Sequence, residues 1–166
     1  MTLTIRPMEL ADCKAVARIY NEGIDDRIAT FETRHRTPAD IASWLETRYP
    51  VVVVTDGRRV VAFAATSTYR PRGCYDGIAE FSVYVARDER GRGAGRLAME
   101  GLIEAAERAG FWKLVSRVFT ENTASLNLLK RVGFREVGVY EKHAKLDGRW
   151  RDVVIVERLL GSFDDD

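Results

Sequence analysis

The chain has 166 residues, with 26 lysines and arginines against 25 aspartates and glutamates, and its formal charge is +1. This length and an average composition favour one folded domain with its own hydrophobic core over a disordered or fibrous chain. The near-zero charge argues against a nucleic-acid-binding protein, and no apolar run approaches the ~20 residues that a membrane-spanning helix needs. We therefore expect a single domain over residues 1–166 that binds neither nucleic acid nor a membrane.

The first residues of the chain and its two cysteines indicate the cellular compartment in which the protein is expected. Arg6, Glu9 and Asp12 carry charges where a signal peptide would need an apolar segment. Cys13 and Cys74 show no Cys-x-x-Cys spacing, so neither a disulfide framework nor a metal site is expected. These features predict a cytoplasmic protein that holds no metal.

The first part of the chain predicts a strand and two helices. Residues 2–6 form a short β-rich run, and Asp12 is a candidate N-cap for a helix whose apolar residues recur at helical spacing. Residues 37–40, Thr-Pro-Ala-Asp, combine an N-cap, a proline in the first turn and a capping acid. A second helix is therefore expected to follow and to end before Pro50.

The middle of the chain predicts a hairpin and then a unit of strand, loop and helix. Residues 51–55 and 60–68 are rich in β-branched residues and flank an Asp-Gly pair, which is a strong hairpin signal. Residues 78–85 predict another strand. The glycine-bearing segment 88–95 then leads into a helix expected over residues 96–109, which a glycine ends.

The last part of the chain predicts three strands and a helix. The strands are expected at residues 114–119, 135–140 and 153–159, and the helix at residues 124–132. The resulting order, βααβββαβαββ, combines a hairpin with crossover connections. It predicts an α/β (α+β) fold in which a mixed, mostly antiparallel sheet of about seven strands carries helices on both faces, and it excludes a plain doubly wound sheet.

The segment between the fourth strand and its helix is suited to anions. Glycines let the backbone turn tightly and bring its N–H groups close to a ligand, and the following helix offers unpaired N–H donors and a partial positive charge. The arginines of the segment add cations that suit a pyrophosphate or a ribose phosphate. The alternative is an ordinary basic loop. The candidate residues are Arg90, Gly91, Arg92, Gly93, Ala94, Gly95 and Arg96.

Two other nucleotide-binding motifs fit this segment poorly. A P-loop would need Gly-Lys-Ser or Gly-Lys-Thr at the start of the helix, and that sequence is absent. A dinucleotide fingerprint can be written over Gly93, Gly95 and Ala98, with Glu121 as the ribose-binding acid. That fingerprint belongs on the first strand of its fold, whereas several strands precede the loop here, so a nicotinamide enzyme is a weak alternative.

Written as Arg90-x-x-Gly93-x-Gly95, the loop resembles the coenzyme A pyrophosphate loop of the GCN5-related N-acetyltransferase (GNAT) superfamily. Asn122-Thr123-Ala124-Ser125 and the Lys-Arg-Val-Gly-Phe of residues 130–134 are similar to the second coenzyme A motif of that superfamily. The predicted element order also agrees with the superfamily. The resemblance implies the GNAT fold, acetyl-CoA as co-substrate and transfer of an acetyl group.

Five further segments resemble the phosphinothricin, methionine sulfoximine and arsinothricin N-acetyltransferases. They are residues 19–22, 29–33, 69–71, 80–85 and 148–152. The stretches 25–33 and 146–150 are more similar to the arsinothricin branch. The resemblance implies an acyltransferase that acetylates the α-amino group of a toxic glutamate or glutamine analogue and so confers resistance, and it implies a homodimer.

A polar row marks the strand at residues 78–85, because alternation places Glu80, Ser82 and Tyr84 on one face. Covered strands are usually apolar on both faces, so Glu80 is expected to face a cleft, where it can accept the proton of an ammonium group. A solvated or ion-paired carboxylate is the alternative. The resemblance implies that Glu80 is catalytic and that the backbone groups of Val83, Tyr84 and Val85 bind pantetheine and polarise the thioester.

In the second coenzyme A motif, Asn122 matches the asparagine that contacts pantetheine, and Ser125 belongs to the same motif. Leu129 falls where many acetyltransferases have a tyrosine, and phosphinothricin-type enzymes often a histidine, near the leaving sulfur. A leucine cannot donate a proton. The thiolate therefore leaves unassisted, or water or another residue protonates it, or activity is low; a thiol pKa near ~8.5 is compatible with unassisted departure.

Arg70 and Pro71 match the Arg-Pro substrate motif of the resembling enzymes, and Arg72 is a further candidate. Phosphinothricin-like molecules carry a carboxylate at one end and a phosphinate or arsinate at the other, and arginine forks suit both groups. A solvated loop is the alternative. Phe31, Phe81 and Ser82 are candidates to line the same pocket, although apolar residues in such runs are more often core.

The histidines and two aromatic residues have no motif partners. His35 and His143 are interpreted as surface or structural residues, and no specific role is assigned to Tyr75 or Trp150. Two other functions stay open. One is acetylation of another amine, such as a protein N-terminus or a polyamine, although the arginines argue against a polyamine. The other is a catalytically silent coenzyme A-binding module, which Leu129 would suit.

Overall fold

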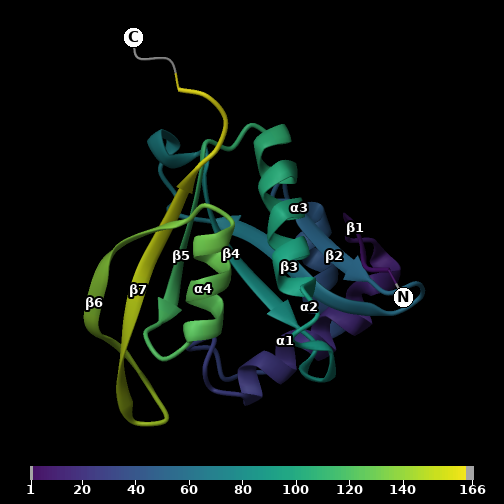
Figure 1. Cartoon of the computed structure of the whole chain (residues 1–166), viewed down its shortest axis with the longest axis horizontal. Helices are drawn as coiled ribbons and strands as arrows, with labels where there is room; N and C mark the ends of the chain where they lie inside the picture. The colour runs from purple at the N-terminus through teal and green to yellow at the C-terminus, as the bar shows by residue number, and fades with distance from the viewer. Residues whose placement is uncertain (1, 164–166) are drawn as a thin grey trace.

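Seven strands form one sheet in the order β1-β2-β3-β4-β5-β7-β6 in the computed structural model, which describes residues 2–163 (Figure 1). The strands are β1 (Thr4–Pro7), β2 (Val51–Thr55), β3 (Val60–Thr68), β4 (Ile78–Val85), β5 (Lys113–Phe119), β6 (Arg135–Leu146) and β7 (Arg149–Leu159). All neighbouring strands are antiparallel except β4 and β5, which are parallel. The predicted mixed, mostly antiparallel sheet is confirmed.

Helices cover both faces of this sheet, as predicted. They are α1 (Cys13–Asp25), α2 (Pro38–Ala42), α3 (Ala94–Arg108) and α4 (Thr123–Arg131), with 3-10 turns η1 (Leu10–Asp12), η2 (Ser43–Glu46), η3 (Gly73–Tyr75) and η4 (Arg87–Glu89). Figure 1 shows α3 and α4 in front of the sheet and α1 and α2 behind it. Each face therefore has its own hydrophobic core.

The strands in the middle of the sheet are buried because both of their faces are covered. All five residues of β2 are buried, and its alternate side chains enter different cores. Val52 and Val54 pack in the core that contains Met99 and Leu102 of α3. Val51 and Val53 pack in the core that contains Ile19 of α1. This is the continuous apolar pattern of a strand enclosed between two helical layers.

The expectation of one helix from residue 37 to Pro50 is wrong in part. The capping box is present, since the Asp40 N–H donates to Thr37 and the Thr37 N–H donates to Asp40. However, α2 ends at Ala42, and a tighter 3-10 turn follows. The Ser43 hydroxyl donates to the Asp40 carbonyl at 2.6 Å, and such local bonds compete with the regular α-helical pattern.

Asp12 does not cap α1, contrary to the sequence prediction. Its side chain makes no capping hydrogen bond to that helix. Instead it accepts the Glu9 N–H at 2.8 Å and two hydrogen bonds from the Arg6 guanidinium at 2.7 and 2.9 Å. The carboxylate therefore links β1 to the turn that precedes α1.

The last two strands are longer than predicted. β6 continues to Leu146 and β7 begins at Arg149, so the hairpin closes over the Asp147-Gly148 turn, where both residues have positive φ of 50° and 76°. β6 is exposed along almost its whole length, so its sequence shows little of the apolar alternation by which a strand is recognised. A bulge between Tyr140 and Ala144 also interrupts its pairing with β7.

The Arg6–Asp12 pair makes the stability of the fold depend on pH. The hydrogen bonds from Arg6 hold the pKa of the buried Asp12 carboxyl below its usual value. A carboxyl whose pKa is lower in the folded chain contributes stability above its unfolded pKa, near ~3.9, and loses that contribution as the pH falls through its folded pKa. We expect Asp12→Asn to lower the free energy of unfolding at pH 7 by about 1–2 kcal/mol.

Urea unfolding of Asp12→Asn and the wild type at several pH values checks this expectation. The difference between the two proteins should shrink below about pH 4. Asp76→Asn, at an exposed position, is the matched control and should change stability by less than ~0.5 kcal/mol. A difference for Asp12→Asn that stays constant down to low pH would contradict the assignment.

Candidate active site

The two parallel strands in the middle of the sheet pair only at their beginning. β4 and β5 are matched at Ile78–Lys113, Ala79–Leu114 and Glu80–Val115, and they then diverge (Figure 1). At the point of divergence the Ser116 hydroxyl donates to the Phe81 carbonyl at 2.9 Å, where a backbone donor would otherwise be. The sheet is therefore open between the carboxyl ends of these strands.

The open edge of β4 presents backbone donors and acceptors. Backbone groups of alternate residues point to the same side of a strand, and the Phe81 carbonyl points toward β5. The N–H and C=O groups of Val83 and Val85 therefore face the opening, whereas those of Tyr84 face β3. Among the described residues, no strand pairs with β4 on this side beyond Glu80.

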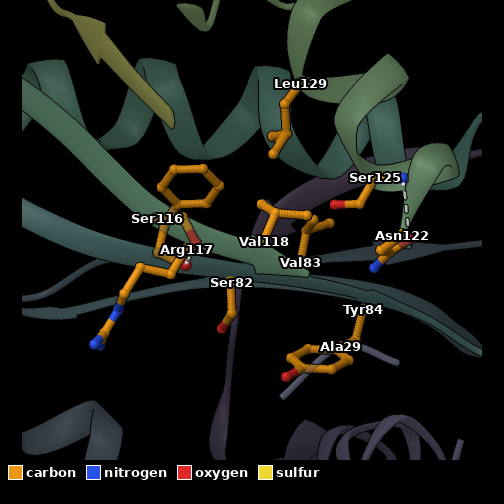
Figure 2. Close-up of a pocket in the computed structure, with 11 residues that line it drawn as sticks. Ala29, Ser82, Val83, Tyr84, Ser116, Arg117, Val118, Asn122, Ser125 and Leu129 are labelled. Atoms are coloured by element: carbon orange, nitrogen blue, oxygen red, sulfur yellow. Dashed lines mark hydrogen bonds between the residues drawn. The ribbon is translucent and has the colours of Figure 1, made fainter. Parts of the chain in front are cut away.

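A small cavity of about 40 Å³, here called the gap cavity, lies between the diverging strands. It is lined by Ala29, Phe81, Ser82, Val83, Tyr84, Ser116, Arg117, Val118, Asn122, Ser125 and Leu129. Figure 2 shows Leu129 and Ser125 of α4 on one side of the sheet and Ser82 and Tyr84 on the other. The gap cavity thus connects the two faces of the sheet.

A second cavity of about 300 Å³, here called the outer cavity, lies beside the gap cavity. Its lining residues are Tyr69, Arg70, Glu80, Val115, Arg117, Tyr140, His143 and Ile155. Arg117 lines both cavities. A molecule in the outer cavity would therefore lie next to whatever occupies the opening between β4 and β5.

Glu80 and Arg117 form an ion pair on the wall of the outer cavity. The Arg117 Nη2 atom lies 3.1 Å from Glu80 Oε1 and 3.4 Å from Oε2. The Glu80 side chain is 28% exposed, so the carboxylate is half-buried but accessible from the cavity. The sequence left two alternatives for Glu80, and the structure shows both features together: an ion-paired carboxylate that also faces a cavity.

Arg70 is a cation on the same wall without a carboxylate partner among residues 2–163. Its guanidinium lies over the Tyr69 ring, 5.2 Å from the ring centroid. The cavity wall therefore carries a carboxylate whose charge is balanced by Arg117 and a second guanidinium that is available to an anion. This arrangement suits a ligand with one ammonium group and one acidic group.

The glycine loop has the backbone that an anion site requires. Gly91 and Gly93 have φ of +84° and +82°, a left-handed conformation that other residues rarely adopt. α3 begins at Ala94 with no side chain capping it, so the N–H groups of its first turn point outward without a partner in the helix. A side chain at Gly95 would place Cβ 2.8 Å from Leu128, so this glycine lets α3 approach α4.

The arginines of the loop all have acidic neighbours. Arg90 lies 2.7 Å from Asp26, Arg96 lies 2.8 Å from Glu100, and Arg92 contacts Glu89. Burial disfavours the charged form of Asp26, but hydrogen bonds from Arg90 and Arg87 outweigh it and lower the pKa of that carboxyl. Exposed ion pairs of this kind contribute ~0–1 kcal/mol each, so an approaching phosphate can replace the carboxylates.

Asn122 caps α4 and joins it to the segment after α1. Its side-chain oxygen accepts the Ser125 N–H at 3.2 Å (Figure 2), and its amide donates to the Ile28 carbonyl at 3.4 Å. Leu129 follows Ser125 by four residues, about one turn of α4. It is 1% exposed and contributes an apolar wall to the gap cavity. No group on this wall can donate a proton at the Leu129 position.

Three of the predicted substrate-binding residues line neither cavity. Pro71 and Arg72 occupy an exposed loop, and Phe31 packs on Phe119 with ring centroids 4.8 Å apart. A fourth, Phe81, lines the gap cavity, but its ring packs against Phe134 in the core. Trp150, to which the sequence assigned no role, is 55% exposed and lines neither cavity.

The residues that line the cavity walls but were not assigned to the site from the sequence include Arg117, Tyr140 and His143. Arg117 could have been found, because a charge inside the apolar strand at residues 114–119 is as unusual as Glu80 in its own strand. His143 is exposed, as expected, but it also lines the outer cavity. Its position depends on the β6 bulge, for which the sequence has no signal.

A sheet that opens between the parallel strands β4 and β5, together with a glycine loop that leads into α3, is the arrangement of an acetyltransferase fold. The profile of the "Acetyltransferase (GNAT) family" matches residues 16–134, and the chain belongs to this family. Both the family resemblance and the enzyme class inferred from the sequence are confirmed.

Three comparisons describe its relatives. The chain is 32% identical to the L-methionine sulfoximine/L-methionine sulfone acetyltransferase of Pseudomonas aeruginosa, over 95% of this chain and 94% of that protein. A phosphinothricin acetyltransferase from Sinorhizobium meliloti, solved in complex with acetyl-CoA, has a TM-score of 0.89 and 30% identity over 97% of this chain and 90% of that one. A ribosomal-protein-alanine N-acetyltransferase from Brucella melitensis has a TM-score of 0.90 and 31% identity, over 95% and 99%.

Across residues 2–163, no three histidine, cysteine or carboxylate side chains gather where they could hold a metal ion. In the same range, no helix has the length and apolar character to cross a bilayer.

Proposed function

We propose that this enzyme transfers the acetyl group of acetyl-CoA to the α-amino group of an amino acid with an acidic or strongly polar side chain, of the phosphinothricin, methionine sulfoximine or arsinothricin type. One observation carries the proposal: the outer cavity combines Glu80 with the guanidinium of Arg70 directly beside the gap cavity. The relatives from Pseudomonas and Sinorhizobium support it, because their names give such acceptors.

The co-substrate fits the groups that surround the opening. The backbone groups of Val83 and Val85 are suited to pair with the amides of pantetheine, as an added strand would. The Asn122 and Ser125 side chains lie at the same opening. The N–H groups at the start of α3 and the arginines around Gly91 and Gly93 are suited to the pyrophosphate.

In the proposed reaction, the carboxylate of Glu80 takes a proton from the acceptor ammonium, directly or through water. The neutral nitrogen attacks the thioester carbonyl carbon and a C–N bond forms. As the C–S bond breaks, the nitrogen, which is positively charged in the adduct, releases its second proton to solvent water and becomes the amide N–H. A backbone N–H of the open β4 edge stabilises the oxyanion. Leu129 supplies no proton, so the sulfur leaves as a thiolate, which its ordinary pKa near ~8.5 permits.

The proposed biological role is resistance. Acetylation removes the ammonium charge and two of its three N–H donors, which an enzyme that binds glutamate or glutamine would recognise. We further infer a cytoplasmic homodimer, on the resemblance that the sequence shows to the phosphinothricin-type enzymes.

Release of free coenzyme A thiol from acetyl-CoA tests the proposed function. The acceptors are arsinothricin, phosphinothricin, methionine sulfoximine, glutamate, a polyamine and a peptide with a free N-terminus. We expect rapid turnover only with the glutamate and glutamine analogues. Turnover confined to the peptide would favour a protein acetyltransferase like the Brucella relative, and acetyl-CoA binding without any turnover would indicate a silent module.

Glu80→Gln tests the base, since the amide keeps the size of the side chain but cannot accept the ammonium proton in the same way. We expect kcat to fall by about 10²-fold or more while the KM for acetyl-CoA stays within twofold. Glu46→Gln, at an exposed site outside both cavities, is the control. Unchanged kcat in Glu80→Gln would refute the assigned role.

Arg70→Ala tests recognition of the acceptor's acidic group. Loss of a charge-assisted hydrogen bond should raise the KM for phosphinothricin by about tenfold or more, with little change in the KM for acetyl-CoA. Arg108→Ala, which removes an exposed arginine paired with Glu104 near the end of α3, is the matched control. An equal effect in both variants would show that the loss reflects charge alone.

A further inference from the structure

The bulge in β6 has an unusual backbone. Tyr140 pairs with Val153 and Ala144 pairs with Arg151, so three residues of β6 stand opposite the single residue Asp152 of β7. Lys142, in the middle of the bulge, has φ of +47°, which is rare for a residue with a side chain. Bulges and strained residues of this kind concentrate near functional sites, where they redirect a side chain.

A side chain from the neighbouring strand holds the bulge in place. The Asp152 carboxylate accepts the Lys142 N–H at 2.7 Å, so the backbone donor that lost its partner in the ladder is bonded. The next residue, His143, lines the outer cavity, and its ring lies 5.0 Å from that of Tyr140. The bulge thus carries one imidazole and one phenol ring to the cavity wall.

The groups that share this cavity come from every strand around it. Glu80 comes from β4, and Arg117 comes from β5. Tyr69 and Arg70 come from the loop that follows β3, while β7 contributes only Ile155. Glu80 and Arg117 are paired with each other. Among the side chains that line the outer cavity, Arg70 and His143 therefore carry N–H donors that are not bound to a carboxylate of residues 2–163.

We propose that His143 is a specificity-determining residue, which donates a hydrogen bond to the acidic distal group of the acceptor together with Arg70. The inference rests on the proposed function, since it assigns this residue to the recognition of the same amino-acid analogues. An imidazole N–H is a suitable donor to a phosphinate or arsinate oxygen, and a hydrogen bond to a charged acceptor is roughly twice as strong as one to a neutral acceptor.

His143→Phe tests the proposal, because phenylalanine keeps a ring beside Tyr140 but has no N–H donor. We expect the KM for phosphinothricin, whose distal group is an anion, to rise about tenfold, and the KM for methionine sulfone, whose distal group is neutral, to rise less than about threefold. The values of kcat and of the KM for acetyl-CoA should stay within twofold. The control is His35→Phe, at the other histidine, which is exposed and paired with Asp25 outside both cavities.

Three results would overturn the proposal: no change in KM, equal changes with both acceptors, or a fall in kcat at constant KM, which would indicate proton transfer. Absence of turnover by the wild type with every analogue would instead refute the proposed function. Asp152→Ala tests the bulge, because it removes the acceptor of the Lys142 N–H. We expect a rise of about threefold in the KM for phosphinothricin; an unchanged value would show that Asp152 does not place the imidazole.

Discussion

The site depends on one interruption of backbone pairing, the divergence of β4 from β5 after Glu80. A central sheet edge left open inside a protein is costly unless its polar groups find partners. Here the Ser116 hydroxyl donates to the Phe81 carbonyl. The backbone donors and acceptors of Val83 and Val85 stay available for hydrogen bonds with an extended ligand. Leu129 of α4 lies on one side of the opening and Tyr84 of β4 lies on the other.

The same divergence determines the chemistry. Glu80 is the last residue of β4 that pairs with β5, so its carboxylate stands at the mouth of the opening and not inside the sheet. Arg117 lies two residues after Val115, the last residue of β5 that pairs with β4, and its guanidinium contacts that carboxylate. The backbone edge, the acid and the adjacent cations therefore all derive from the point at which two parallel strands separate.

Local patterns in the sequence predicted the elements that local physics determines. The alternation at residues 78–85 predicted that Glu80 faces a cavity, and the glycines before α3 predicted a tight turn into that helix, because turn backbone and strand faces are encoded over a few residues. Arg117 and His143 were not predicted to line the site. The position of Arg117 depends on which strand lies beside β4, and the position of His143 depends on a bulge that Asp152 holds in place. Asp12 was misassigned for a related reason: its competing partner, Arg6, lies on another element.

The carboxylates that pair with the loop arginines compete with any anion that binds to the same guanidinium groups. Asp26 occupies Arg87 and Arg90 at 2.8 and 2.7 Å, and Glu89 occupies Arg92. A small anion that reaches only one of these arginines exchanges one carboxylate for another anion and gains little. A diphosphate that also meets the N–H groups of the first turn of α3 gains bonds that no carboxylate of the loop supplies. In the proposed function, these carboxylates would therefore favour a diphosphate over a simple anion and would keep the arginines in position when the loop is empty.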